Sequence, residues 1–152
     1  IDRLATFLAD WESPCCLCCP HVGKRLVERN VDVTILDVDE RFSSLPGFRH
    51  FDLTQPEWLG KPFGIILCDP PFFSVSFSQL VVALRMLARN DFSQPLIVSY
   101  LTRRAAAFES AFVPFGLKRT GYQPGYETVE KSPKNEIELW GNLNDEDRHQ
   151  LL

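Results

Sequence analysis

A short segment, Asp69-Pro70-Pro71-Phe72, has the composition of a site that holds an amino group. It directly follows the apolar run 63–68, so it stands at the end of an expected buried strand. Its two prolines prevent regular helix or sheet pairing and fix an extended backbone. The Asp69 carboxylate and the Pro70 carbonyl are therefore rigidly placed acceptors beside the flat Phe72 ring. Two acceptors next to an aromatic plane suit a planar group that carries an NH2.

Apolar runs typical of strands alternate with helical patterns along the chain. The expected strands are residues 15–19, 33–36, 48–51, 63–68 and 96–100, followed by a final pair, 115–118 and 137–141. The expected helices are residues 2–11, 22–29, 76–88 and 103–112. This alternation predicts an α/β protein with a mainly parallel sheet and helices on both faces. At 152 residues, the chain has the size of a single domain, residues 1–152.

The sequence Cys68-Asp69-Pro70-Pro71-Phe72 resembles the Asp/Asn-Pro-Pro-Tyr/Phe motif of N6-adenine methyltransferases that use S-adenosylmethionine. Segments 18–22, 35–42 and 134–137 are similar, in order, to the first, second and last strands of a eukaryotic set in this family. That set includes the zinc-finger ribosomal RNA adenine methyltransferase and the translation elongation factor lysine methyltransferase. The resemblance implies a Rossmann-like class I methyltransferase, whose mainly parallel seven-stranded sheet ends in an antiparallel strand pair.

The resemblance also implies a role for each residue of the motif. Asp69 and the Pro70 carbonyl would accept hydrogen bonds from the target amine, and Phe72 would stack on its ring, with Pro71 completing the rigid turn. An exocyclic amine is a poor nucleophile because its lone pair is delocalised into the ring, and accepting its protons returns that pair to nitrogen. The implied substrate is an adenine of RNA or DNA. A Pro-Pro loop with a capping Asp and a core Phe is the structural alternative.

Ligands of open parallel sheets bind beyond the carboxyl ends of the strands, where strand order reverses. The usual glycine-rich loop is replaced here by Pro20-His21-Val22-Gly23, which has a single glycine. Acids at strand ends commonly bind ribose hydroxyls, which makes Asp37 the first candidate and Asp39 the second, while Asp52 could accept from the adenine of the cofactor. The predicted cofactor-binding residues are Cys19, Pro20, His21, Gly23, Asp37, Asp39 and Asp52. Each acid could instead cap a helix or lie at a solvated strand end.

Four of the five cysteines are clustered at positions 15, 16, 18 and 19, and the fifth is Cys68. Zinc sites use pairs separated by two to four residues, with a second pair further along the chain. In a strand, Cys15 and Cys19 would face one way and Cys16 and Cys18 the other, so the thiolates would not converge. The cluster therefore predicts buried free thiols, no metal site and a reducing, cytoplasmic location.

The overall charge of −4, with 45% hydrophobic and 24% charged residues, does not indicate a general nucleic-acid binder. The second half nevertheless contains residues that could form a local basic and aromatic face for a nucleic-acid strand. These are Tyr122, Tyr126, Trp140, Arg103, Arg104, Lys118, Arg119, Lys131 and Lys134. An ordinary solvated surface is the alternative. No apolar run approaches the roughly 18 residues of a membrane span, so no membrane partner is expected.

Three functions are compatible with these patterns. The leading hypothesis is an N6-adenine methyltransferase that acts on RNA or DNA. A protein lysine methyltransferase is the first alternative, because Asp69 and Phe72 could hold an amine through charge and cation–π attraction. A non-catalytic, methyltransferase-shaped binding module is the second, since the chain is short and its glycine loop is degenerate.

Overall fold

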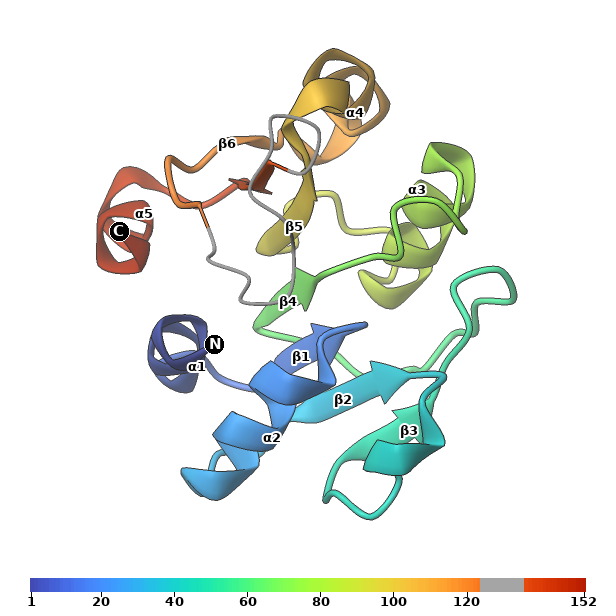
Figure 1. Cartoon of the computed structure of the whole chain (residues 1–152), viewed down its shortest axis with the longest axis vertical. Coiled ribbons are helices and arrows are strands. Elements are labelled where there is room, and N and C mark those ends of the chain that lie inside the picture. The colour runs from blue at the N-terminus through green and yellow to red at the C-terminus, as the bar shows by residue number, and fades with distance from the viewer. Residues whose placement is uncertain (124–135) are drawn as a thin grey trace.

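Seven strands form one sheet in the part of the chain that the structure describes, residues 1–123 and 136–152 of a computed structural model (Figure 1). They are β1 (Pro14–Leu17), β2 (Thr34–Asp37), β3 (Phe48–His50), β4 (Ile65–Cys68), β5 (Leu96–Leu101), β6 (Lys118–Arg119) and β7 (Ile137–Gly141). Their order is β3-β2-β1-β4-β5-β7-β6. β1 to β5 run parallel, and β7 is antiparallel to both β5 and β6. The predicted mainly parallel sheet with an antiparallel C-terminal pair is confirmed.

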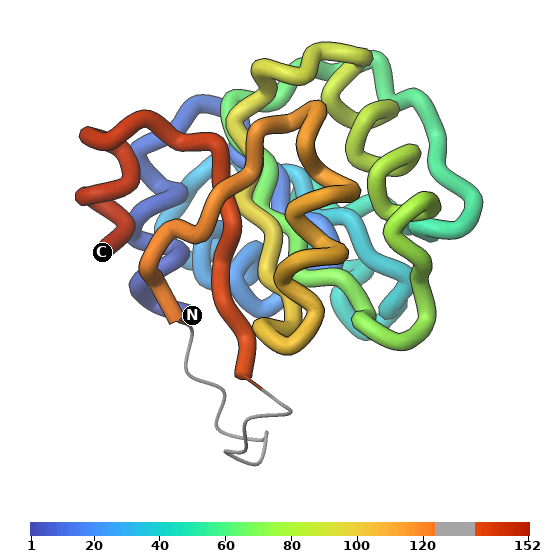
Figure 2. Tube along the Cα trace, turned by 90° about the horizontal axis from the view of Figure 1, so that it is seen from above, coloured from blue at the N-terminus to red at the C-terminus, as the bar shows by residue number. Residues whose placement is uncertain are grey.

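Helices cover both faces of this sheet, as predicted. They are α1 (Asp2–Ala9), α2 (Pro20–Glu28), α3 (Phe77–Leu87), α4 (Ala105–Ala111) and α5 (Asp145–Leu151), with short 3-10 helices η1 (Glu40–Phe42), η2 (Thr102–Arg104) and η3 (Val113–Phe115). Buried side chains of α1, α2 and α5 form one core, and those of α3 and α4 belong to another. Figure 2 shows α1 beside α5, where Arg3 Nε donates to the Leu151 carbonyl at 3.0 Å.

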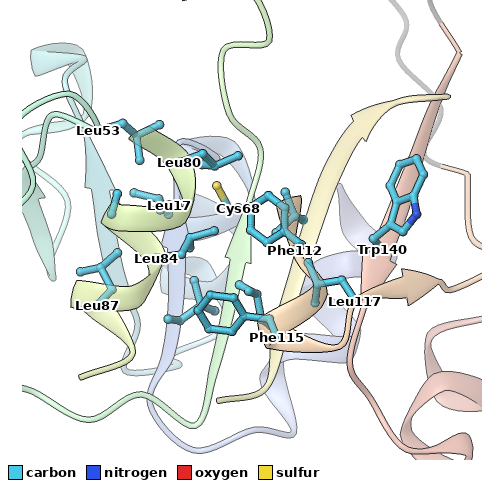
Figure 3. Packing of buried hydrophobic residues seen from close by; sticks show 14 of the residues in the cluster. Leu17, Leu53, Cys68, Leu80, Leu84, Leu87, Phe112, Phe115, Leu117 and Trp140 are labelled. Carbon is cyan, nitrogen blue, oxygen red and sulfur yellow. The ribbon is translucent and has the colours of Figure 1, made fainter. Parts of the chain in front are cut away.

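The core under α3 and α4 supports β4, the strand that leads to the tetrapeptide Asp69-Pro70-Pro71-Phe72. Figure 3 shows Leu80 and Leu84 pointing from α3 toward Cys68 of β4. All three side chains are at most 1% exposed, and full burial of one leucine contributes about 1.5–3 kcal/mol. α3 begins after a capping box, in which the Ser76 hydroxyl accepts from the Gln79 N–H and the Gln79 side chain accepts from the Ser76 N–H.

The C-terminal region differs from the prediction at two places. The expected strand 115–118 is wrong at its start, because residues 113–115 form η3, with Pro114 in its first turn and Gly116 ending it at a φ of +67°. Only Lys118–Arg119 pairs with β7. Helix α5 was not among the predicted helices, although Asn144 caps it by accepting from the Asp147 N–H at 2.8 Å.

The cysteine cluster follows the predicted alternation only as far as the strand extends. Cys15 lies in the core under α3 and α4, and Cys16 lies in the opposite core. The expected directions of the next two cysteines are wrong: Cys18 packs on the Cys15 side, and Cys19 on the Cys16 side. The strand ends at Leu17 and Cys18 adopts a φ of +60°, so the two-residue period is broken there.

Candidate active site

The tetrapeptide Asp69-Pro70-Pro71-Phe72 lies at the carboxyl end of β4, beside β1, where the strand order reverses. The Asp69 N–H donates to the Leu17 carbonyl at 3.0 Å, which extends the pairing of β4 with β1 by one residue. Pro70 is buried, Asp69 and Phe72 are half-buried, and Pro71 is exposed. The segment is therefore anchored to the sheet at one end without being sealed inside the core.

The Asp69 carboxylate is held by the neighbouring strand. Ser99 of β5 donates from its hydroxyl to Asp69 Oδ1 at 2.5 Å. Ser99 is only 2% exposed, and it is a polar residue within the otherwise apolar run Leu96–Leu101. A buried polar side chain needs a partner, and a charge-assisted bond to a carboxylate is among the stronger ones. Ser99 was not among the predicted site residues, although its polarity inside a buried strand was an available signal.

The next residue of β5 holds the other end of the tetrapeptide. The Tyr100 hydroxyl donates to the Phe72 carbonyl at 3.4 Å, and the two rings form an edge contact with centroids 5.2 Å apart. Arg104 Nη1 in turn donates to the Tyr100 hydroxyl at 3.0 Å. Because this oxygen accepts from Arg104, its own proton is directed to Phe72. Tyr100 was not among the predicted site residues, and Arg104 was expected only in the basic and aromatic face, because the sequence does not reveal this contact.

The segment after β1 brings the start of α2 to the same edge of the sheet. Pro20 occupies the first helical turn, where its missing N–H costs little. Gly23 fits against β2 because it has no side chain: a Cβ there would come within 2.6 Å of Ile35 Cγ1. The Gly23 N–H is bonded to the Cys19 carbonyl at 3.2 Å. The single glycine of this segment therefore lies within α2 and allows close packing of that helix on β2.

Three carboxylates, Asp37, Asp52 and Asp69, surround the end of β1. Burial and the charges of these acids raise the pKa of the Cys18 thiol well above its usual range. Asp37 Oδ1 accepts from the Asp39 N–H at 2.8 Å. Asp52 Oδ1 accepts from the backbone and hydroxyl of Thr54, which lower the pKa of this carboxyl. Among the described residues, no donor is bonded to the second oxygen of either Asp37 or Asp52.

Asp39, the second candidate for the ribose, differs from Asp37 because both of its carboxylate oxygens accept hydrogen bonds from Arg41. Its Oδ1 caps η1 by accepting from the Arg41 N–H, and both of its oxygens bond the Arg41 side chain, the shortest at 2.7 Å. Hydrogen bonds from Arg41 lower the pKa of this carboxyl. The alternative that the sequence offered for each acid, a helix cap, describes Asp39. Among the described residues, Asp37 keeps one oxygen without a donor whereas Asp39 does not, and the ribose role of either acid stays a prediction.

The other predicted cofactor residues differ in accessibility. The Cys19 thiol is buried and donates to the Leu67 carbonyl at 3.5 Å, so this side chain belongs to the core. Pro20 is also buried. His21 is exposed and its ring meets Phe42 edge-on, with centroids 5.1 Å apart. Contact of these residues with a cofactor stays a prediction.

The expected basic and aromatic face is present only in part. Trp140 is fully buried and its Nε1 donates to Glu109 at 3.0 Å, so it does not belong to a surface. Arg119 is paired with Glu138 at 3.2 Å. Arg103, Arg104 and Lys118 are exposed, and Tyr122 is half-buried. Tyr126, Lys131 and Lys134, with most of the expected loop 121–135, lie outside the described residues.

The model of the family described as probable N6-adenine methyltransferase matches residues 3–144. This chain belongs to that family. The match includes the tetrapeptide, the acids at the strand ends and the residues of β5 that hold the motif. The family predicted from the sequence is thus confirmed. A comparison with curated protein sequences finds no match.

Several solved methyltransferases share the fold of this family member. Magnesium protoporphyrin IX methyltransferase from Synechocystis PCC 6803, with bound SAM, is 15% identical with a TM-score of 0.63, over 92% of this chain and 76% of that one. The methyltransferase domain of bacterial CtHen1-CN is 11% identical with a TM-score of 0.64, and the match covers 92% of this chain and 95% of that one. Pyrococcus abyssi tRNA (uracil-54, C5)-methyltransferase, in complex with S-adenosyl-L-homocysteine, is 14% identical with a TM-score of 0.59. The match covers 92% of this chain and 36% of that one. The predicted Rossmann-like methyltransferase fold is confirmed, and the predicted cofactor agrees with the SAM and S-adenosyl-L-homocysteine bound in the Synechocystis and Pyrococcus enzymes.

Within residues 1–123 and 136–152, no group of three or more His, Cys, Asp or Glu side chains could hold a metal ion. The helices of these same residues include none with the length and apolar character needed to cross a bilayer.

Proposed function

We propose that this protein transfers a methyl group from S-adenosylmethionine to the exocyclic amine of adenine in RNA or DNA. The observation that carries the proposal is the fixed geometry of the tetrapeptide at the strand-order reversal. Ser99 and Tyr100, adjacent in β5, hold its two ends through Asp69 and Phe72. The name of the family supports adenine as the target.

The chain has groups that fit the cofactor at the neighbouring strand ends. Asp37 has one oxygen bonded within its own turn, and we assign its second oxygen to the ribose diol. Asp52 has the same arrangement and would accept from the amino group of the cofactor. Packing of Gly23 on Ile35 brings the start of α2 to the same edge. When bound, S-adenosylmethionine supplies an electrophilic methyl group on a positively charged sulfur.

The residues of the tetrapeptide prepare the amine for attack. Asp69 and the Pro70 carbonyl would each accept one N–H of the adenine amine, which returns lone-pair density to the nitrogen. Phe72 would stack on the base, and stacking contributes about 1–3 kcal/mol per base. The amine must lose one proton as the new N–C bond forms, and Asp69 would accept it and release it to water because the carboxylate is half-buried. The enzyme thus contributes placement and proton acceptance.

Transfer of radiolabelled methyl groups to pools of RNA, DNA and protein tests this function. We expect label in N6-methyladenine of a nucleic-acid pool. Asp69→Ala should abolish transfer while calorimetry shows cofactor binding close to that of the wild type. Asp69→Asn keeps an acceptor oxygen and should retain part of the activity, since the family motif also uses Asn at this position.

The same experiment separates the alternatives. Label confined to protein would refute the adenine proposal and favour lysine, a substrate for which the net charge of −4 is suitable. Absence of cofactor binding at millimolar concentration would favour a binding module. Undiminished transfer by Asp69→Ala would show that the site is wrongly assigned.

A further inference from the structure

An exposed aromatic ring follows the tetrapeptide directly. Phe73 is 80% exposed, the largest exposed fraction among the large hydrophobic side chains of the described residues. η2 begins where β5 ends, and the Arg103 guanidinium carbon lies 5.7 Å from the centre of the Phe73 ring. The adjacent Arg104 lies 4.5 Å over the Phe77 ring. We call Phe73, Arg103 and Arg104 the Phe73 platform.

The Phe73 platform carries two positive charges, those of Arg103 and Arg104. Within residues 1–123 and 136–152, neither Arg103 nor Arg104 forms an ion pair with a carboxylate. Arg119, by contrast, pairs with Glu138 at 3.2 Å. The exposed Phe73 ring with Arg103 over it, and Arg104 over the neighbouring Phe77 ring, are complementary to a partner that carries both negative charge and flat rings. A polynucleotide strand has this combination in every unit.

We propose that the Phe73 platform binds the nucleotide next to the target adenine in a single-stranded nucleic acid. This inference rests on the proposed function, because it assigns the preceding residue, Phe72, to the target base. A base would stack on the free face of the Phe73 ring, and Arg103 and Arg104 would neutralise adjacent phosphates. The carboxylates of an acidic polypeptide would neutralise the arginines but would not stack on the Phe73 ring. The platform therefore selects a nucleic acid rather than any polyanion.

Fluorescence anisotropy tests this with a short labelled single-stranded RNA and the matching DNA, in the presence of S-adenosylhomocysteine. Phe73→Ala should weaken binding about tenfold, whereas Phe73→Trp should retain it. Arg103→Ala should reduce the salt dependence of log Kd by about one unit. Matched controls are Val113→Ala, an apolar side chain that is 70% exposed on η3, and Arg148→Ala, whose arginine pairs with Asp145 on α5. Both controls should bind as the wild type does.

The outcomes distinguish the platform from the proposed function. If Phe73→Ala binds the oligonucleotides as tightly as the controls while the wild type methylates adenine, the platform is overturned and the proposed function stands. Competition by polyglutamate that matches competition by unlabelled oligonucleotide would also overturn the platform, because the ring would then add nothing. If the wild type binds neither oligonucleotide and methylates only protein, both proposals fail.

Discussion

The Ser99 hydroxyl donates to the Asp69 carboxylate at 2.5 Å across a separation of 30 residues. The two residues lie side by side because β4 and β5 are parallel neighbours in which Cys68 is opposite Val98, the residues that directly precede Asp69 and Ser99. A carboxylate that can rotate freely samples many orientations, whereas this one is held by a buried donor. Ser99 is accordingly a positioning residue for the proposed reaction.

We expect Ser99→Ala to lower kcat by roughly tenfold or more, since a hydrogen bond to a charged group is worth about 1.5–3 kcal/mol. Methyl-transfer kinetics and calorimetry with S-adenosylhomocysteine measure this, and cofactor affinity should not change. Ser99→Thr keeps the hydroxyl and should restore part of the rate. Ser93→Ala is a matched control, because Ser93 makes the same bond to Asp91 at 2.5 Å before β5 begins. Equal losses in both alanine variants would contradict a positioning role.

Tyr100→Phe tests the contact at the other end of the tetrapeptide. The substitution removes the hydroxyl that donates to the Phe72 carbonyl and keeps the ring that packs on Phe72 and Phe108. We expect KM for the acceptor to rise several-fold, with a loss of about 1 kcal/mol in the free energy of unfolding. Steady-state kinetics and urea denaturation report the two quantities. A variant with wild-type kinetics would show that the hydroxyl does not position Phe72.

Asp37 and Asp39 differ in what occupies their oxygens, so their variants should differ. Asp37→Ala should weaken S-adenosylhomocysteine binding about tenfold, a loss of about 1.4 kcal/mol. Asp39→Ala should change it little, because Arg41 already occupies both oxygens of Asp39. Isothermal titration calorimetry on the two proteins decides the matter. The reverse order of affinities would transfer the ribose role to Asp39.

Gly23→Ala places a Cβ within 2.6 Å of Ile35 Cγ1. Overpacking of this kind costs about 1–3 kcal/mol in the free energy of unfolding. Adding Ile35→Ala should make the double variant less unstable than the sum of the two single changes, because the clash is removed. Lys24→Ala, at an exposed position of the same helix, is the control. Simple additivity in urea denaturation would refute the packing role.

The thiols predict a dependence of stability on pH. Burial raises the pKa of Cys15, Cys19 and Cys68 well above the ordinary value of 9.0. Native thiols therefore keep protons that the unfolded chain releases, so their contribution to stability is complete below about pH 9 and is lost as the pH rises above it. We expect the melting temperature to fall in that range.

Alkylation provides an independent test of the same thiols. Iodoacetamide at pH 8 should modify the native protein slowly, because the thiolate is the reactive form and these thiols stay protonated. After unfolding in urea, all five cysteines should react. Mass spectrometry counts the added groups. Rapid modification of the native protein would contradict the burial of these side chains.

The sequence by itself determined the order of most helices and strands, since the apolar periodicity of each segment is a local property. It also predicted a rigid backbone after β4, because two prolines that follow a buried strand prevent regular helix or sheet pairing. The predicted strand start at residue 115 and the predicted direction of Cys18 are wrong because of local backbone geometry. A 3-10 turn at η3 and the positive φ of Cys18 interrupt the strand periodicity.

Only the tertiary structure decided which side chains form hydrogen bonds with the tetrapeptide. Ser99 and Tyr100 reach Asp69 and Phe72 because β5 pairs in parallel with β4, and no local pattern encodes that register. The same holds for Asp37 and Asp39, which are close in sequence but bonded to different partners. Periodicity reports which face of an element is buried, whereas contacts between distant side chains depend on how the elements pack.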